Sequence, residues 1–195
     1  EGADAVVMVE HTQEVDPSTI EVTRPVAPGE NVVRGGEDVT RGERLLPKGH
    51  CLRPQDVGGL LGVGILTVSV VRRPRVVIIA TGDEVVPPPV EPGPGQVRDI
   101  NTYTIATLVL QAGGIPQPLG IVRDDYDALR EAAESGITQG DALIISAGSS
   151  VSTRDMTAGV IGTLGRPGVL VHGVALKPGK PTILAVCGDK PVFGL

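Results

Sequence analysis

Aromatic side chains are nearly absent from this chain of 195 residues, which contains no tryptophan, two tyrosines and one phenylalanine. Proteins that bind single-stranded nucleic acid stack bases on aromatic rings, so this composition argues against that class. The formal net charge of −6 argues against a general nucleic-acid binder as well, because such proteins gather basic side chains on one surface.

Cysteine and histidine are also scarce. Cys51 and Cys187 lie far apart and belong to no Cys-x-x-Cys pattern, so we expect two reduced, buried thiols rather than a disulfide or a metal site. The histidines, His11, His50 and His172, are scattered along the chain, which argues against a zinc centre.

Long hydrophobic runs are missing too. No apolar run approaches the roughly 20 residues needed to cross a bilayer, and no signal peptide is visible, so we expect a cytoplasmic protein. The chain begins at Glu1 without an initiator methionine and ends at Leu195 within strand-like sequence, and we therefore expect a central fragment of a longer protein.

What the chain does contain is a regular alternation in its second part. Short apolar runs alternate with helical patterns, and several of the runs end in acidic or glycine-rich loops. The apolar runs cover residues 75–80, 117–122, 142–145, 169–172 and 181–186, and the helical patterns cover residues 101–112, 127–135 and 155–164. This order predicts an α/β fold over residues 74–195, a three-layer sandwich with a mostly parallel sheet.

Residues 1–73 have a different pattern, with short β-segments and many turn-forming residues. We predict strands at residues 6–9, 20–22 and 65–71, a turn at Asp16-Pro17-Ser18, and a short helix at residues 54–61. This part is therefore expected to be a smaller β-rich accessory region. Arg73-Pro74 is the expected junction, because proline restricts both itself and the residue before it.

Acidic side chains follow the predicted strands. They are Asp83, Glu84, Asp99, Asp124, Asp125 and Asp155. In a parallel sheet the carboxyl ends of the strands meet at one edge, so several of these carboxylates are expected to converge there. Mg²⁺ is the natural neutralising ion, because it takes oxygen ligands and bridges carboxylates to substrate phosphates. For Asp125 and Asp155 taken singly, a helix cap remains the alternative.

Two loops have features of an anion site. Residues 146–155 form a loop of small and hydroxyl-bearing residues between a predicted strand and a helix, where backbone N–H groups bind anions favourably. Lys177 and Lys180 lie in a stiff Lys-Pro-Gly-Lys-Pro turn. Together they suit a phosphate-bearing or oxyanion ligand. The alternative for the lysines is a solvent-exposed proline turn with no ligand.

The motifs also occur in a recognisable order. They are Glu1 to Val7, Arg34 to Asp38, Leu60 to Ile65, Thr81-Gly82-Asp83-Glu84, Pro94 to Asn101, Gly120 to Asp125, Ser146 to Asp155, and Lys177-Pro178-Gly179-Lys180-Pro181. This ordered set resembles the molybdopterin molybdenumtransferases, the MoeA family, which includes the gephyrin E-domain. The resemblance extends over nearly the whole chain.

That resemblance implies Mg²⁺-dependent insertion of molybdate into adenylylated molybdopterin (molybdopterin-AMP), with release of AMP. It further implies a homodimer whose site is completed across the two subunits, and molybdopterin adenylyltransferase as a further candidate partner. The implied catalytic residues are Glu84, Asp124, Asp155 and Lys177, the implied metal ligands are Glu84, Asp155 and Asp38, and the implied substrate-binding residues are Thr81, Gly82, Asp83, Ser146, Gly148, Ser149, Ser150 and Lys180.

The chain departs from the family pattern at three places. The binding loop has Ala147 and Ser152 where the family has glycines, and a Cβ there crowds a backbone that must approach a ligand closely. Gly173 stands where a basic residue is common. From the resemblance we also expect the family's N-terminal segment to precede Glu1, and its proline-rich motif and small C-terminal domain to follow Leu195, in a longer protein.

Two alternatives to this enzyme remain open. A molybdopterin adenylyltransferase has a similar α/β domain and a stretch like Arg154-Asp155-Met156-Thr157, but it would not carry a matching segment before Arg75. A non-catalytic molybdopterin-binding or scaffold module would keep the fold without turnover, as the altered loop glycines permit. Restoring both glycines, at Ala147 and Ser152, would distinguish a scaffold from an enzyme.

Overall fold

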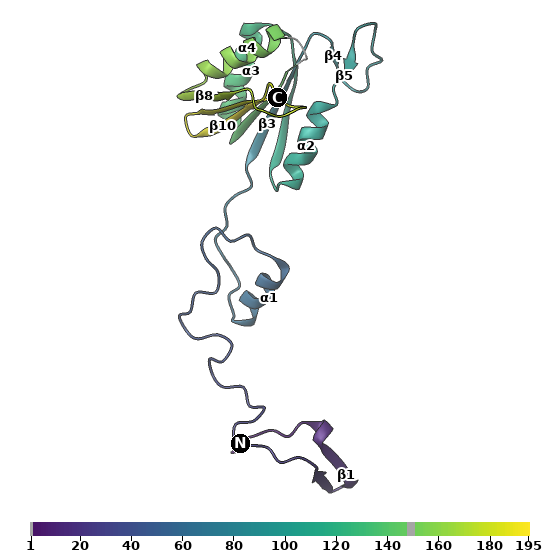
Figure 1. Cartoon of the computed structure of the whole chain (residues 1–195), viewed down its shortest axis with the longest axis vertical. Coiled ribbons are helices and arrows are strands. Elements are labelled where there is room, and N and C mark those ends of the chain that lie inside the picture. Colours follow the sequence, from purple (N-terminus) through teal and green to yellow (C-terminus); the bar gives the residue numbers. More distant parts are fainter. Residues whose placement is uncertain (1, 148–150) are drawn as a thin grey trace. The chain divides into compact units, whose positions relative to one another are not determined.

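The computed structural model describes residues 2–147 and 151–195 and divides the chain into two compact units (Figure 1). The first unit is Glu1–Ser69 and the second is Val70–Leu195. None of the described helices is long and apolar enough to cross a membrane.

The first unit contains little regular structure. A 3-10 turn, η1 (Val9–His11), leads into an antiparallel pair, β1 (Thr12–Asp16) and β2 (Thr19–Val22), and α1 (Pro54–Gly62) follows later. The predicted turn is present, because Ser18 donates to Asp16 Oδ1 from both its backbone N–H and its hydroxyl. The predictions of strands at residues 6–9 and 65–71 are wrong, since neither stretch forms a β-strand.

An ionic cluster orders the start of α1. The carboxylate of Asp56, in the first turn, lies 2.7 Å from His50 Nε2 and accepts from Arg53 Nε at 3.0 Å and from the Arg53 backbone N–H at 2.9 Å. The hydrogen bonds from Arg53 and then His50 hold the pKa of Asp56 well below its usual range. Cys51, beside His50 in the sequence, is exposed, so our expectation of a buried thiol was wrong there and is confirmed only for Cys187.

The second unit is built on a six-stranded sheet with the order β6-β3-β7-β10-β9-β8. Its strands are β3 (Arg75–Thr81), β6 (Ile115–Val122), β7 (Ala142–Ser146), β8 (Pro167–His172), β9 (Ile183–Cys187) and β10 (Lys190–Gly194). The first four strands in this order run parallel, and β9 runs antiparallel to both of its neighbours. The prediction of a mostly parallel sheet is therefore confirmed.

Helices cover both faces of this sheet, as a three-layer sandwich requires (Figure 1). On one face α2 (Asn101–Gln111) packs Ile105 and Val109 against Ile78 of β3. On the other face α3 (Tyr126–Gln139) and α4 (Val151–Thr163) join a core that includes Val77 and Ile79. Successive residues of β3 thus point to opposite faces and are buried on both, which explains the continuous apolar run in the sequence.

The helix boundaries settle the question of the acidic caps. Asp125 is the N-cap of α3 and accepts from the Ala128 backbone N–H at 2.8 Å. Asp155 lies inside α4, because this helix begins at Val151, four residues earlier than predicted. The cap alternative therefore holds for Asp125 and not for Asp155.

An acid-dependent contact ties the start of β3 to the loop before β7. Asp141 accepts from Arg72 Nη1 at 2.6 Å and from the Arg75 backbone N–H at 2.8 Å, and these bonds hold its pKa well below the usual range. A lowered pKa stabilises the folded state above the unfolded-state pKa of about 4, and this stabilisation is lost as the pH falls further. We expect Asp141→Asn to lower the free energy of unfolding at pH 7 and to flatten its decline between about pH 5 and 2.

Urea unfolding at a series of pH values measures this difference. Asp127→Asn, on the exposed surface of α3, is the matched control and should retain the wild-type pH dependence. An Asp141→Asn variant with the same acid sensitivity as the wild type would contradict the prediction.

Candidate functional site

Several of the site residues predicted from the sequence lie at one edge of the six-stranded sheet. The parallel strands β3, β7 and β10 end there, at Thr81, Ser146 and Gly194. Gly194 pairs with Ile183 at the start of β9, and Ile183 pairs with His172 at the end of β8. The loop of residues 173–182, which contains the two predicted lysines, therefore begins and ends at this same edge.

A pocket of about 450 Å³ opens at this edge. Its lining residues are Ala80, Thr81, Glu84, Val85, Val97, Arg98, Asp99, Ile100, Asn101, Ser146, Ala147, Pro181 and Leu195. The predicted residues Thr81, Glu84 and Ser146 are among them. Thr81 ends β3, Glu84 lies in the loop after β3, and Ser146 ends β7. All of the lining residues belong to the second unit.

Two of the predicted acids are joined through the end of β3. The buried Thr81 hydroxyl donates to Asp124 Oδ1 at 2.9 Å, and the Asp124 backbone N–H donates to Asp83 Oδ1 at 3.3 Å. Asp83 follows β3 and Asp124 follows β6, so these bonds connect the ends of two neighbouring strands. Thr81 thus contributes to the pocket wall and also holds an acid beside it.

Gly82 makes the close turn that brings Glu84 to the pocket. Its φ is +149°, and a Cβ at this position would lie 2.7 Å from Val85 Cγ2 and 2.9 Å from Glu84 Oε2. Any other residue would therefore displace the Glu84 side chain or the following strand. The glycine predicted to bind substrate has a structural reason to be there whether or not it touches a ligand.

The start of α2 forms the opposite part of the lining. Asn101 Nδ2 donates to Ser146 Oγ at 3.1 Å, and buried Asp99 accepts from the Thr102 backbone N–H at 3.0 Å. The side chain that accepts at the start of this helix is that of Asp99, which sequence reasoning named only among the acids that follow the predicted strands. The spacing Asp-x-x-Thr before a helical stripe was the available signal.

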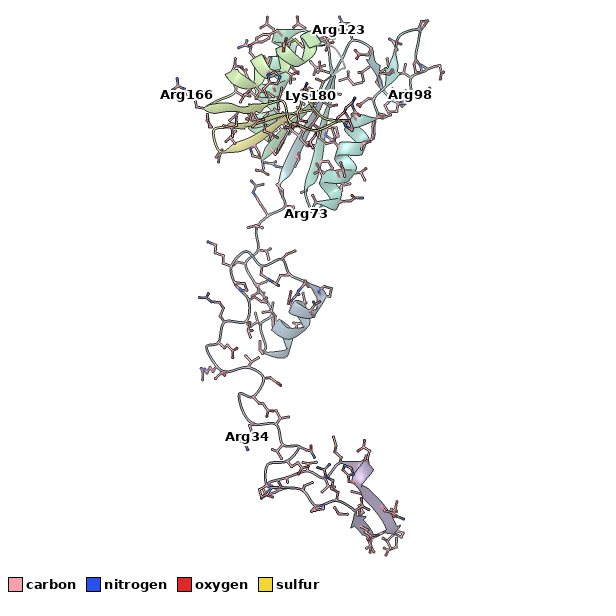
Figure 2. All side chains as sticks on the ribbon, in the orientation of Figure 1. Arg34, Arg73, Arg98, Arg123, Arg166 and Lys180 are labelled. Atoms are coloured by element: carbon pink, nitrogen blue, oxygen red, sulfur yellow. The ribbon has the colours of Figure 1, made fainter. Side chains whose placement is uncertain are left out.

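The predicted lysines lie in the loop beside the pocket and do not line it. Lys177 and Lys180 are both exposed, and Lys180 is labelled in Figure 2. Their loop is closed by backbone bonds, one from Val174 N–H to the Lys180 carbonyl at 2.8 Å and one from Thr182 N–H to the Gly179 carbonyl at 3.1 Å.

Two further predicted acids, Asp155 and Asp38, are not among the described residues that line this pocket. Asp155 is exposed on α4, and Asp38 is exposed in a bend of the first unit. Gly148, Ser149 and Ser150 lie outside the described residues. Over residues 2–147 and 155–195, the structure holds no group of three or more His, Cys, Asp or Glu side chains arranged to bind a metal ion.

The chemistry of the pocket nevertheless fits Mg²⁺. The donors that line it are carboxylate and hydroxyl oxygens, from Glu84, Asp99, Thr81 and Ser146. Mg²⁺ is commonly bound by one or two carboxylates, with water and substrate phosphates as its other ligands. A full set of protein ligands is therefore not required before the substrate arrives.

Comparison with known proteins decides the family. Residues 77–195 match the family model described as the probable molybdopterin binding domain. The chain belongs to this family. The molybdopterin-binding domain contains the whole pocket, and a second family model, the MoeA N-terminal region (domain I and II), matches residues 1–64. The resemblance to MoeA proteins seen in the sequence is thereby confirmed.

Individual relatives match nearly the whole length of this chain. A molybdopterin molybdenumtransferase from Bacillus subtilis is 38% identical over 200 residues, which are 100% of this chain and 46% of that protein. The enzyme of the same name from Nostoc sp. is 36% identical over 190 residues, 97% of this chain and 43% of that protein. The crystal structure of the molybdopterin biosynthesis MoeA protein from Pyrococcus horikosii is 41% identical, with a TM-score of 0.74, and the match covers 98% of this chain and 47% of that one. The chain thus spans about half the length of the relatives it matches.

Proposed function

We propose that this protein acts in molybdenum cofactor biosynthesis as a molybdopterin molybdenumtransferase. The proposed reaction is the Mg²⁺-dependent insertion of molybdate into adenylylated molybdopterin, with cleavage of the phosphoanhydride bond and release of AMP. The observation that carries this proposal is the pocket lined by Thr81, Glu84 and Ser146 within a molybdopterin-binding domain. The printed names of the relatives from Bacillus subtilis and Nostoc support the reaction type.

The proposed roles follow the chemistry of each side chain. Glu84 and Asp155 are proposed to hold Mg²⁺, and Lys177 and Lys180 are proposed to hold the negative charges of phosphate or molybdate. Asp124 is fixed by the Thr81 hydroxyl beside the pocket, which suits a residue that must keep one orientation during the reaction. When bound, Mg²⁺ neutralises the charge on the phosphates and on the departing AMP.

The protein is further proposed to work as a homodimer in the cytoplasm, with molybdopterin adenylyltransferase as a candidate partner that supplies the adenylylated substrate. The match of residues 1–64 to the MoeA N-terminal region favours the molybdenumtransferase over an adenylyltransferase. The segment that distinguishes the two enzymes thus lies in the first unit, although the pocket lies in the second.

Calorimetric titration of adenylylated molybdopterin into the protein, with and without Mg²⁺, tests the proposal. We expect binding to weaken about 10-fold or more when Mg²⁺ is removed, and to a similar extent in Asp155→Asn, because the first change removes the metal that neutralises the phosphates and the second removes a proposed ligand of that metal. Asp189→Asn, in the exposed turn before β10, is the control and should bind as the wild type does.

Tight binding that changes neither on removal of Mg²⁺ nor in Asp155→Asn would contradict the metal-dependent reaction.

The second candidate function is a non-catalytic scaffold. Ala147 lines the pocket at a place where the family has glycine, and this observation favours the scaffold. An inactive wild type that gains molybdate insertion on the double change Ala147→Gly and Ser152→Gly would establish that second function.

A further inference from the structure

The pocket has an unusual balance of charge for a site that receives phosphates. Among its described lining residues, Glu84 and Asp99 are acidic, and Arg98 is the one basic side chain. Two carboxylates repel an anion, so a phosphate that enters this pocket is drawn toward the arginine.

Arg98 is the last residue of a short parallel pair that the sequence did not predict. β4 (Val85–Val86) pairs with β5 (Val97–Arg98), and the proline-rich residues 87–96 connect them. Val86 pairs with Arg98, and this pairing places the arginine at the pocket. Arg98 is labelled in Figure 2. The strand that follows the proline-rich loop therefore carries a pocket residue.

The arginine is held by that same loop. Arg98 Nε donates to the Pro88 carbonyl at 3.1 Å, and Arg98 Nη2 donates to Glu91 Oε2 at 2.7 Å. A guanidinium has five N–H donors, so most of its donor capacity is left for other acceptors. The Glu91 side chain is 90% exposed and that of Arg98 44% exposed, and an ion pair so open to water contributes little to stability.

We propose that Arg98 binds a phosphate group of the substrate and that this phosphate displaces the Glu91 carboxylate from the guanidinium. The proposal rests on the proposed function, because the substrate of that reaction contains a phosphoanhydride. Guanidinium groups bind phosphate oxygens through two parallel N–H bonds, a geometry that lysine does not offer. Glu91 then acts as a placeholder that keeps Arg98 beside the pocket and competes with the ligand.

The proposal predicts opposite effects on ligand binding for substitutions at the two partners of this ion pair. Removing the Arg98 charge removes the phosphate contact, so binding weakens. Removing the Glu91 charge removes the competitor, so binding tightens. If the pair served only to hold the proline-rich loop in place, both changes would act in the same direction, because each breaks the same contact.

The test measures binding of two probes, adenylylated molybdopterin and inorganic pyrophosphate, by calorimetry in the presence of Mg²⁺. We expect Arg98→Gln to raise the dissociation constants of both probes by about 10- to 100-fold. The constants of Arg98→Lys should lie between those of Arg98→Gln and those of the wild type. We expect Glu91→Gln to tighten binding by about 2- to 5-fold. Arg130→Gln and Glu134→Gln, an exposed ion pair on α3 at 3.6 Å, are the matched controls and should leave both constants unchanged.

The two probes distinguish a failure of this inference from a failure of the proposed function. Wild-type binding of adenylylated molybdopterin that is insensitive to Arg98→Gln, or that weakens in Glu91→Gln, would overturn the role of Arg98 and leave the proposed function standing. Binding of pyrophosphate that depends on Arg98, without binding of adenylylated molybdopterin, would support the anion site and overturn the proposed function. Binding of neither probe by the wild type would overturn both.

Discussion

Glu84→Gln is expected to lower the rate of molybdate insertion by about 100-fold or more, the effect of removing one well-placed electrostatic contact from an active site. Glu84 lines the pocket, and the turn at Gly82 directs it there with little room to spare. Glutamine keeps the shape of the side chain and removes its charge, so it would lose the role proposed for Glu84, which is to hold Mg²⁺ against the substrate phosphates. Release of AMP from adenylylated molybdopterin, followed at saturating molybdate, measures the rate.

The matched control is Glu131→Gln, an exposed position on α3, which should retain the wild-type rate. The thermal unfolding of both variants shows whether the fold survives the change. A folded Glu84→Gln protein whose rate stays within about 3-fold of the wild type would remove Glu84 from the catalytic residues, since a loss of metal binding costs far more.

Leu129→Ala is expected to have the largest effect on stability, about 3 kcal/mol or more. Leu129 on α3 is 0% exposed and belongs to the core cluster that contains Val77, Ile79 and Leu143. Truncating its side chain loses the transfer free energy of the removed atoms and leaves a cavity between the helix and the sheet. Equilibrium unfolding in urea measures the change in the free energy of unfolding.

Leu108→Ala is the same substitution at an exposed helical position, because Leu108 on α2 is 58% exposed. Its free energy of unfolding should stay within about 0.5 kcal/mol of the wild type, as is usual for surface substitutions. Similar losses at Leu108 and Leu129 would show that the outer face of α2 is covered in solution, or that the α3 side of the sheet is not the main core.

The sheet of the second unit was predictable because burial on both faces has a direct sequence signature. Residues 75–80 are a continuous apolar run, and they form β3 with its side chains buried on both sides. The run at residues 65–71 has a similar β-branched composition and forms no strand. Val70 and Val71 are 71% and 94% exposed there, because a strand needs a hydrogen-bonded neighbour and composition does not supply one.

The candidate site was predictable in part for the same reason. Thr81 and Ser146 could be placed at one edge because each ends an apolar run, and the parallel order brings such ends together. Arg98 lies within the motif Pro94 to Asn101, but sequence reasoning gave it no role in the site. Its place in the pocket depends on β4 and β5, a pair of two-residue strands too short to leave a periodic signal.

By itself, the sequence determined the fold class of the second unit, the acidic and hydroxyl-bearing character of the site, and the likeness to MoeA proteins, because these depend on local composition and on the order of motifs. The tertiary structure decided which of those residues meet. Thr81 and Ser146 line one pocket because β3 pairs directly with β7, and Arg98 joins them because Glu91 and Pro88 hold it there. Pairing between strands is non-local, so it follows from the packing of the whole sheet rather than from any short stretch of the chain.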